Sequence, residues 1–424
     1  MKKIAIIGAG ISGLSAAEFL NRKFHTTIFE KESTPGGLIR CKDINGSLFH
    51  TCGGHVFNSK SGEVLSWFWS HFNKESFVNS IRNSSIILED GNYIPYPIEN
   101  HVYLLNEDIK RGFFADLDKI ECDFGNDASL NSYSDFGDFL KNRFGKTLYA
   151  LYFGPYNKKI WRKDPSLIPI SWMEGKLPMP TVNEMRNANK LQLEETGFVH
   201  SSFWYENNGG SQYLADILAK NLDVRYNSEI NKLVYQERKW IIDNEVFDAV
   251  LFCGNIKEMV NIIEGVDLNP WKTKIDEFQY HGTTSVFCEI DANPYSWIYL
   301  PDSRYNCHRI ICTGNFSKNN NSVEIPNDRT TGTVEFTDYV PHDSILEELK
   351  SVPLHPKYLS HSYNKYTYPV QNKDTRSIVA DFKKNLCAKG FFFTGRFADW
   401  EYYNMDVAVL AAMKTCNKIV ELTY

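Results

Sequence analysis

The sequence predicts an α/β fold in which a Rossmann-like domain is interrupted by a helical domain and by an antiparallel-sheet domain. Three observations predict it. The chain opens with an apolar strand, a glycine-rich turn and a helix, and a strand, a glycine and a helix return near its end. Between these ends lie aromatic-rich stretches with helical spacing, and after them short runs in which apolar and polar residues alternate. A length of 424 residues is too great for one ordinary core, so two or three domains are expected.

The first element is a strand over residues 3–7, an uninterrupted apolar run typical of a central parallel strand. The glycine motif of residues 8–13 (GAGISG) follows directly and leads into a helix. In this context Gly8 allows a tight turn, Gly10 lets the backbone approach a pyrophosphate, and Gly13 lets the helix pack closely on the strand. The motif therefore predicts a dinucleotide site at the start of the helix.

The second strand, residues 26–30, ends in Glu30, and an acid at that point accepts hydrogen bonds from a ribose diol. A second glycine pair, Gly36-Gly37, follows it, and Arg40 lies just beyond. This arrangement resembles flavoproteins of the glutathione-reductase and amine-oxidase type, in which the loop covers the FAD pyrophosphate. NAD dehydrogenases usually lack this loop, so the sequence predicts FAD. No second glycine motif for NADPH is visible.

The C-terminal segment supports the same cofactor. It predicts a strand over residues 391–394, a turn at Gly395-Arg396 and an amphipathic helix from about Val407. In the same flavin families, a late unit of this kind returns to the flavin ring. The predicted cofactor-binding residues are Gly8, Gly10, Ile11, Ser12, Gly13, Glu30, Lys31, Gly37, Leu38, Gly54, His55, Arg396 and Asp406.

The domains are expected to be discontinuous. One hairpin is expected within the helical part, with Asp90-Gly91 as its turn. The expected division is an FAD-binding domain of residues 1–65, 205–265 and 385–424, a mainly helical substrate domain of residues 66–180, and an antiparallel sheet domain of residues 181–204 and 266–384.

Composition excludes several classes of function. A net charge of −6 provides no basic surface for nucleic acid or for an acidic membrane. The nine cysteines include no C-x-x-C pair, which argues against a disulfide framework or a zinc site and favours a reducing compartment. No run reaches the roughly 18 apolar residues needed to span a bilayer. We therefore expect a cytoplasmic protein with no metal, no nucleic-acid partner and no integral membrane segment.

The remaining motifs indicate substrate positioning, because no Ser/His/Asp order and no close carboxylate pair stands out. His55 follows a glycine pair and is a candidate to lie beside the flavin ring; a loop histidine with a backbone hydrogen bond is the other interpretation. Basic residues together with tyrosine hydroxyls suit an anion such as a diphosphate. Taken singly, each such residue is more often structural. The candidate substrate-binding residues are Glu99, Asn100, Tyr156, Asn157, Trp161, Lys176, Arg309 and Tyr402.

Taken together, these segments resemble the UDP-galactopyranose mutase family of nucleotide-sugar flavoenzymes. The resemblance covers most of the chain and is carried, after the FAD glycines, by GGHVF, PYPIEN, YNKKIW, FWYENNGGSQYL, YNCHRIICTGNFS and GRFADWEYYNMD. The last segment is specific, since these mutases carry Gly-Arg followed by an aromatic stretch and an Asp-Met-Asp-like tripeptide.

The resemblance implies an isomerase that interconverts the pyranose and furanose forms of a nucleotide sugar similar to UDP-galactose, for surface polysaccharide synthesis. In this family the reduced flavin is the nucleophile at the anomeric carbon and displaces the nucleoside diphosphate. The sugar ring then opens, closes at the other size and recaptures the diphosphate, with no net redox change. The resemblance allows NAD(P)H as an external reductant and a homodimeric assembly.

The resemblance also implies residue roles. His55 matches the histidine of the mobile loop beside the flavin, Arg309 the diphosphate-binding arginine, and Tyr402 a diphosphate-contacting tyrosine. Trp161 would pack against the sugar or the uracil. His55, Arg309 and Lys176 are the catalytic candidates that follow.

Three positions depart from the family pattern. A second diphosphate-clamping arginine appears here as Lys176, which keeps the charge but loses the bidentate fork. The first acid of the tripeptide is Asn404, and Glu99 stands where a neutral amide would suit a sugar hydroxyl. The sugar and the base therefore stay open, with deoxy, amino and heptose sugars as alternatives. An FAD oxidase or desaturase of the amine-oxidase or protoporphyrinogen-oxidase type is the alternative function, and a non-catalytic flavin-fold partner protein is a third.

Overall fold

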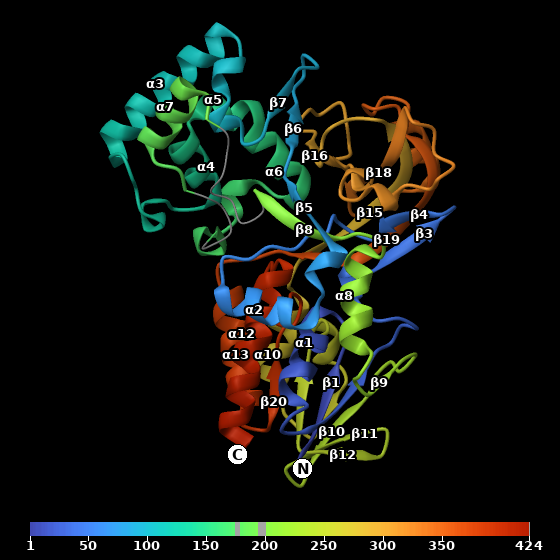
Figure 1. Ribbon diagram of the computed structural model, residues 1–424. Coiled ribbons are helices and arrows are strands. Elements are labelled where there is room, and N and C mark those ends of the chain that lie inside the picture. Colours follow the sequence, from blue (N-terminus) through green and yellow to red (C-terminus); the bar gives the residue numbers. More distant parts are fainter. Residues whose placement is uncertain (174–178, 194–200, 424) are drawn as a thin grey trace.

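The computed structural model describes residues 1–173, 179–193 and 201–423. Figure 1 shows a layered region at the bottom, which holds both ends of the chain, and above it a group of helices beside an antiparallel sheet. The layered region is assembled from segments that are far apart in the sequence. The predicted α/β fold, a Rossmann-like domain interrupted by helical and antiparallel parts, is confirmed.

A five-stranded sheet forms the centre of the layered region. Its strand order is β20 (Phe391–Phe393), β13 (Ala249–Phe252), β1 (Lys3–Ile7), β2 (His25–Phe29) and β9 (Val224–Arg225). Every neighbouring pair is parallel, and β13 is buried throughout, as expected for apolar strands covered on both faces. The strands predicted near the two ends of the chain are confirmed, and they lie in one sheet.

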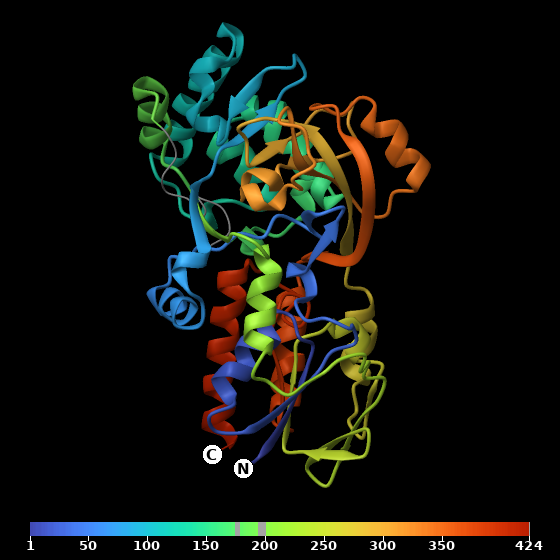
Figure 2. The same cartoon turned by 45° about the vertical axis from the view of Figure 1, so that its right-hand side comes forward.

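Alternate side chains of β1 face two different cores, as the two-residue period of a strand requires: Ile4 and Ile6 belong to one, Ala5 and Ile7 to the other. Helices α1 and α13 run together over the first face (Figure 2). The first face is covered by α1 (Ile11–Leu20), α2 (Gly62–His71), α8 (Gly210–Ala219) and α13 (Met405–Thr423). The second is covered by α9 (Ile256–Met259), α10 (Asn269–Asp276), α12 (Thr375–Cys387) and a small sheet of β12 (Glu245–Phe247), β11 (Lys239–Ile242), β10 (Leu233–Gln236) and β14 (Ile263–Glu264).

The upper sheet has seven strands and is antiparallel except for one pair. Its order is β19 (Lys357–Pro369), β15 (Tyr280–Asp291), β18 (Arg329–Thr337), β17 (Arg309–Ile311), β16 (Trp297–Tyr299), β6 (Ser84–Ile87) and β7 (Tyr93–Pro95). The predicted hairpin is confirmed as β6 and β7, with Gly91 at a φ of 81° in its turn. Because β6 pairs in parallel with β16, this hairpin extends the large sheet.

The helical part packs against the hairpin end of that sheet. Its helix α3 starts at the side-chain cap of Asn106 and ends at Gly125, and α7 starts with a capping box of Thr181 and Glu184. A π-helical turn over Tyr149–Phe153 leads into α6. The helices are α3 (Glu107–Phe124), α4 (Phe136–Phe144), α5 (Lys146–Leu148), α6 (Gly154–Trp161) and α7 (Val182–Leu191), with α11 (His342–Leu349) elsewhere on the upper sheet.

Two short strand pairs connect the regions. They are β3 (Cys41–Ile44) with β4 (Ser47–His50), and β5 (Phe77–Ile81) with β8 (Ser202–Glu206). Within the described part of the chain, no helix is both long enough and apolar enough to cross a membrane.

Candidate functional site

The glycine motif forms a tight turn at the N-terminus of α1. Gly8 has a φ of +104°, and a Cβ on Gly13 would lie 2.0 Å from the carbonyl oxygen of Gly8. Gly13 therefore lets α1 pack directly on the turn. A Cβ on Gly10 would meet nothing within 4 Å, so the backbone there faces open space at a helix N-terminus, the place where a phosphate binds. The turn fits a dinucleotide pyrophosphate.

Two distant loops adjoin this turn. The N–H of Gly36 donates to the carbonyl of Ala9 at 2.8 Å, and a Cβ on Gly37 would lie 3.3 Å from Cα of Gly10. A Cβ on Gly395 would lie 3.2 Å from Oγ of Ser12. The structure thus brings together the predicted first glycines, the second glycine pair and the C-terminal turn. Of the other predicted residues here, Ile11 and Leu38 are partly buried and Lys31 is exposed.

Glu30 lies beside the glycine turn at the end of β2. Its side chain is buried, one carboxylate oxygen accepts the N–H of Ala9 at 2.7 Å, and the other accepts the N–H of Glu32 at 3.0 Å. The carboxylate therefore ties the turn to the second loop. Its contact with a ribose remains a prediction.

Two buried polar atoms on the upper side of the layered region have no hydrogen-bond partner among the described residues. They are Nε2 of His55 and one oxygen of Asp406, whose other oxygen accepts the Ser59 hydroxyl at 3.1 Å. Burial lowers the pKa of His55 well below its usual value, so the ring is neutral, and burial raises the pKa of Asp406. Buried atoms of this kind normally find partners, so both fit a bound polar ligand such as a flavin.

His50 supports the segment that carries His55. Its ring nitrogens contact the hydroxyls of Tyr205 at 2.9 Å and Ser211 at 3.1 Å, and its Nδ1 lies 3.4 Å from the backbone nitrogen of His55. The ring is completely buried, and this desolvation lowers the pKa of His50 to about 3.

The buried state of His50 predicts sensitivity to acid. Folded His50 stays neutral, whereas the unfolded chain takes up a proton as the pH falls through about 6.5. This part of the free energy of unfolding is therefore complete above that pH and is lost as the pH falls toward 3, by about 1.4 kcal/mol per pH unit. Urea unfolding between pH 7.5 and 5 measures the slope. His50→Gln should flatten it, replacement of the exposed His25 by Gln should not, and equal slopes in all three proteins would contradict the assignment.

One face of the upper sheet carries a polar row across neighbouring strands. Strand pairing sets Ser285 opposite Glu335, Glu335 opposite Arg309, and Arg309 opposite Tyr299. Residues opposite one another in a sheet point to the same face, so this row is built by strand register. A Cβ on Gly54 would lie 2.7 Å from the side chain of Ile311, which places the loop before His55 against the same face.

Arg309 is the centre of this row. Its Nε donates to Glu335 at 2.5 Å, and its Nη2 donates to the hydroxyl of Tyr368 at 3.3 Å. Burial by itself lowers the pKa of Arg309, but the carboxylate of Glu335 outweighs it, and the pKa lies well above its usual value. Arg309 is therefore a permanent cation.

Aromatic rings surround this cation. Tyr368 stacks on Tyr402 with ring centres 5.5 Å apart, and Trp161 meets Tyr368 edge-on at 5.8 Å. Tyr156 meets Tyr299 edge-on at 5.4 Å. The structure thus gathers the predicted Tyr156, Trp161 and Tyr402 near the predicted Arg309.

The predicted Arg396 links this group to the C-terminal turn. Its guanidinium lies over the ring of Tyr402, 4.5 Å from the ring centre, and it donates to the carbonyls of Thr367 at 3.1 Å and Tyr403 at 3.2 Å. The arginine near the dinucleotide site and the arginine on the sheet are therefore joined by two stacked tyrosines.

Other predicted residues have different surroundings. The amide of Asn157 donates to the carbonyl of Phe153 at 2.8 Å, a bond within its own helical segment. Glu99 is buried, and its charge contributes to the raised pKa of the buried Tyr152, after burial itself and neighbouring tyrosines. Asn100 follows it in the same short turn, and Asn404 is exposed. Lys176 lies outside the described residues.

Sequence reasoning missed three residues of the site. Glu335 and Tyr368 both contact Arg309, and Tyr299 lies opposite it. All three lie in runs with strand alternation, but the alternation shows only that a side chain shares a face with its own neighbours. Register between strands decides which faces meet, and no local pattern states it.

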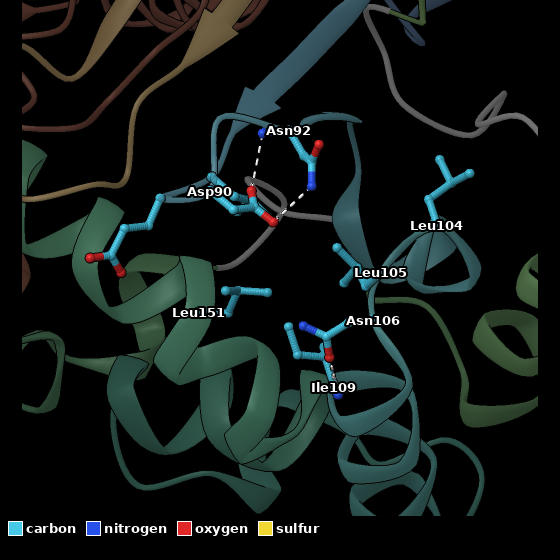
Figure 3. Close-up of a pocket in the computed structure, with 9 residues that line it drawn as sticks. Asp90, Asn92, Leu104, Leu105, Asn106, Ile109 and Leu151 are labelled. Carbon is cyan, nitrogen blue, oxygen red and sulfur yellow. Dashed lines mark hydrogen bonds between the residues drawn. The ribbon is translucent and has the colours of Figure 1, made fainter.

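A cavity of about 210 Å³ lies away from these residues, between the hairpin turn and the start of α3 (Figure 3). Its polar side chains have local partners: the amide of Asn92 donates to Asp90 at 2.7 Å, and Asn106 accepts the N–H of Ile109 at 3.0 Å. These are a turn contact and a helix cap, so we assign the cavity no ligand. It is lined by Leu88, Glu89, Asp90, Asn92, Leu104, Leu105, Asn106, Ile109 and Leu151.

Comparison with known proteins agrees with this geometry. Residues 6–72 match the model of the NAD(P)-binding Rossmann-like domain family. The chain is 23% identical to the UDP-galactopyranose mutase of Mycoplasma genitalium, over 98% of this chain and 94% of the relative. The fold matches a crystal structure of reduced UDP-galactopyranose mutase with a TM-score of 0.86 at 21% identity, over 100% of this chain and 94% of that one. The resemblance predicted from the sequence is confirmed over the whole chain.

The same fold occurs in flavin enzymes of other activity. A putrescine oxidase bound to putrescine matches with a TM-score of 0.68 at 14% identity, over 99% of both chains. The fold is therefore shared by isomerases and oxidases, and the reaction has to be argued from the site.

Proposed function

We propose that this protein is an FAD-dependent nucleotide-sugar mutase, an isomerase that interconverts the pyranose and furanose forms of a UDP-galactose-like sugar. The observation that carries the proposal is the set of Arg309, Tyr368, Tyr402 and Trp161 beside the dinucleotide site. An arginine flanked by tyrosine hydroxyls suits a diphosphate, and a tryptophan edge suits a sugar or a base. An amine oxidase has no diphosphate to bind at that place.

The chain's own residues would bind and orient the diphosphate. Arg309 directs Nε and Nη2 toward Glu335 and Tyr368, which leaves Nη1 for the ligand. Burial raises the pKa of Tyr368, so its hydroxyl stays protonated and can donate to an anion while it accepts from Arg309. Negative charge that develops on the diphosphate as the anomeric bond breaks would be stabilised by these donors.

The dinucleotide site would hold FAD through the glycine turn, Glu30 and the turn at Gly395, with His55 and Asp406 facing the flavin. When bound, reduced FAD would supply the nucleophile for the anomeric carbon. Neutral His55 would add no charge beside it. We further propose that NAD(P)H reduces the flavin, and that the product serves surface polysaccharide synthesis in the cytoplasm, where the nine free cysteines stay reduced.

The proposal predicts turnover in the reduced state alone. Dithionite-reduced protein should convert UDP-galactopyranose, or a related nucleotide sugar, to a furanose product that is separated by chromatography. The oxidised protein should give none. Stoichiometric oxygen consumption with an amine, without isomerisation of any nucleotide sugar, would identify an oxidase instead.

A further inference from the structure

Glu335 is a fully buried carboxylate shared by two parts of the site. One oxygen accepts from Nε of Arg309 and lies 2.5 Å from Nη2 of the same side chain. The other oxygen accepts the N–H of Gly53 at 2.7 Å and the hydroxyl of Ser285 at 3.3 Å. A single acid therefore holds both the proposed anion-binding arginine and the loop that carries His55.

The arrangement depends on special local features. Gly53 has a φ of +68°, which favours glycine, and the missing Cβ of Gly54 allows the loop to lie on the sheet beside Ile311. Strand register brings Glu335 between Arg309 and Ser285. Loop and arginine are thus 256 residues apart in sequence, counted from Gly53 to Arg309, and meet at one carboxylate.

The charges make the acid responsive to a ligand. The nearby His308 has Nε2 at 3.8 Å, but burial and then the charge of Arg309 lower its pKa well below its usual value, so the ring is neutral. Arg309 is therefore the cation that balances Glu335. An anion on Arg309 competes with Glu335 for the same guanidinium, which strengthens the acid's remaining bond to Gly53.

We propose that Glu335 is a positioning residue that couples an anion on Arg309 to the position of the loop Gly53–His55 beside the cofactor. The nature of the anion, a nucleoside diphosphate, rests on the proposed function. The coupling itself is a property of the four side-chain and backbone groups described above.

Glu335→Gln tests the coupling in the FAD-loaded protein with UDP as the probe. The variant should retain flavin but bind UDP about tenfold more weakly. At saturating UDP, the change in flavin absorbance seen in the wild-type protein should be largely lost. The matched control is Glu206→Gln, another buried acid, which accepts the N–H of Asn208 at 3.0 Å and has no contact with Arg309. Wild-type affinity and absorbance change in Glu335→Gln, or equal losses in both variants, would overturn the proposal.

A second measurement needs no ligand. In Arg309→Ala, Glu335 loses its cation, so amide hydrogen exchange at Gly53 should change about tenfold while exchange in β1 stays constant. Unchanged exchange at Gly53 would overturn the coupling whether or not UDP binds. If the wild-type protein binds no nucleoside diphosphate, the proposed function fails, and the exchange result still decides the role of Glu335.

Discussion

Replacing Arg309 by alanine is expected to weaken UDP binding about 100-fold while flavin content and the visible spectrum stay unchanged. The side chain is the cation of the polar row, and its free Nη1 points away from Glu335 and Tyr368. No contact of Arg309 with the glycine turn is present, so the flavin should be retained. Isothermal titration with UDP gives the affinity, and absorbance at the flavin maximum gives the cofactor content.

The same substitution should also destabilise the fold, because it leaves Glu335 buried without its cation, a loss of about 3 kcal/mol. Adding Glu335→Gln to Arg309→Ala should restore part of that stability but not the UDP affinity. Arg304 provides the control, since it is an exposed arginine paired with Asp302 on the same sheet domain. Arg304→Ala should bind UDP normally. Loss of flavin with intact UDP binding in Arg309→Ala would contradict the assignment of the anion site.

Alanine at Gly13 and alanine at Gly10 should fail in different ways. A Cβ at Gly13 would lie 2.0 Å from a backbone oxygen, so Gly13→Ala must displace α1 from the turn and should lower both thermal stability and FAD content. A Cβ at Gly10 meets only open space, so Gly10→Ala should leave the stability of the flavin-free protein within about 0.5 kcal/mol of wild type. It should still bind FAD weakly, because the methyl group occupies the space that a pyrophosphate needs.

Thermal unfolding of the flavin-free and FAD-loaded forms separates the two effects. The wild-type protein should gain stability from FAD, Gly10→Ala should not, and Gly13→Ala should be less stable in both forms. Equal FAD affinity in Gly10→Ala and the wild-type protein would show that the dinucleotide site is elsewhere.

The elements at both ends of the chain could be predicted because their signals are local. The run at residues 3–7, the glycines after it and the strand at Phe391–Phe393 each contain their own evidence, and the structure confirms them. The hairpin around Gly91 was visible for the same reason. Its pairing with β16 was not, since the partner strand lies 200 residues further along the chain and no residue of the hairpin specifies it.

The site was predictable only in part. Arg309 and Tyr402 were found through a family resemblance in their segments, and the structure brings both close to Tyr368. Glu335 and Tyr368 sit in ordinary alternating strands, so their importance follows from register and from burial, which are tertiary properties. A buried acid in a strand is itself a signal, because such a charge requires a partner.

The order of strands in the parallel sheet has a consequence for how the protein is made. The first strand to leave the ribosome, β1, pairs with β13 about 245 residues later, and β13 in turn pairs with β20 close to the C-terminus. The turn at Gly395, which adjoins Ser12, and the helix α13, which packs along α1, come last of all. During synthesis the upper sheet and the helices can fold early, whereas the dinucleotide site is incomplete until the final segment has emerged. Cofactor loading is therefore a post-translational event in this chain, and the nascent N-terminal strand and helix must be kept from misassociation until their C-terminal partners arrive.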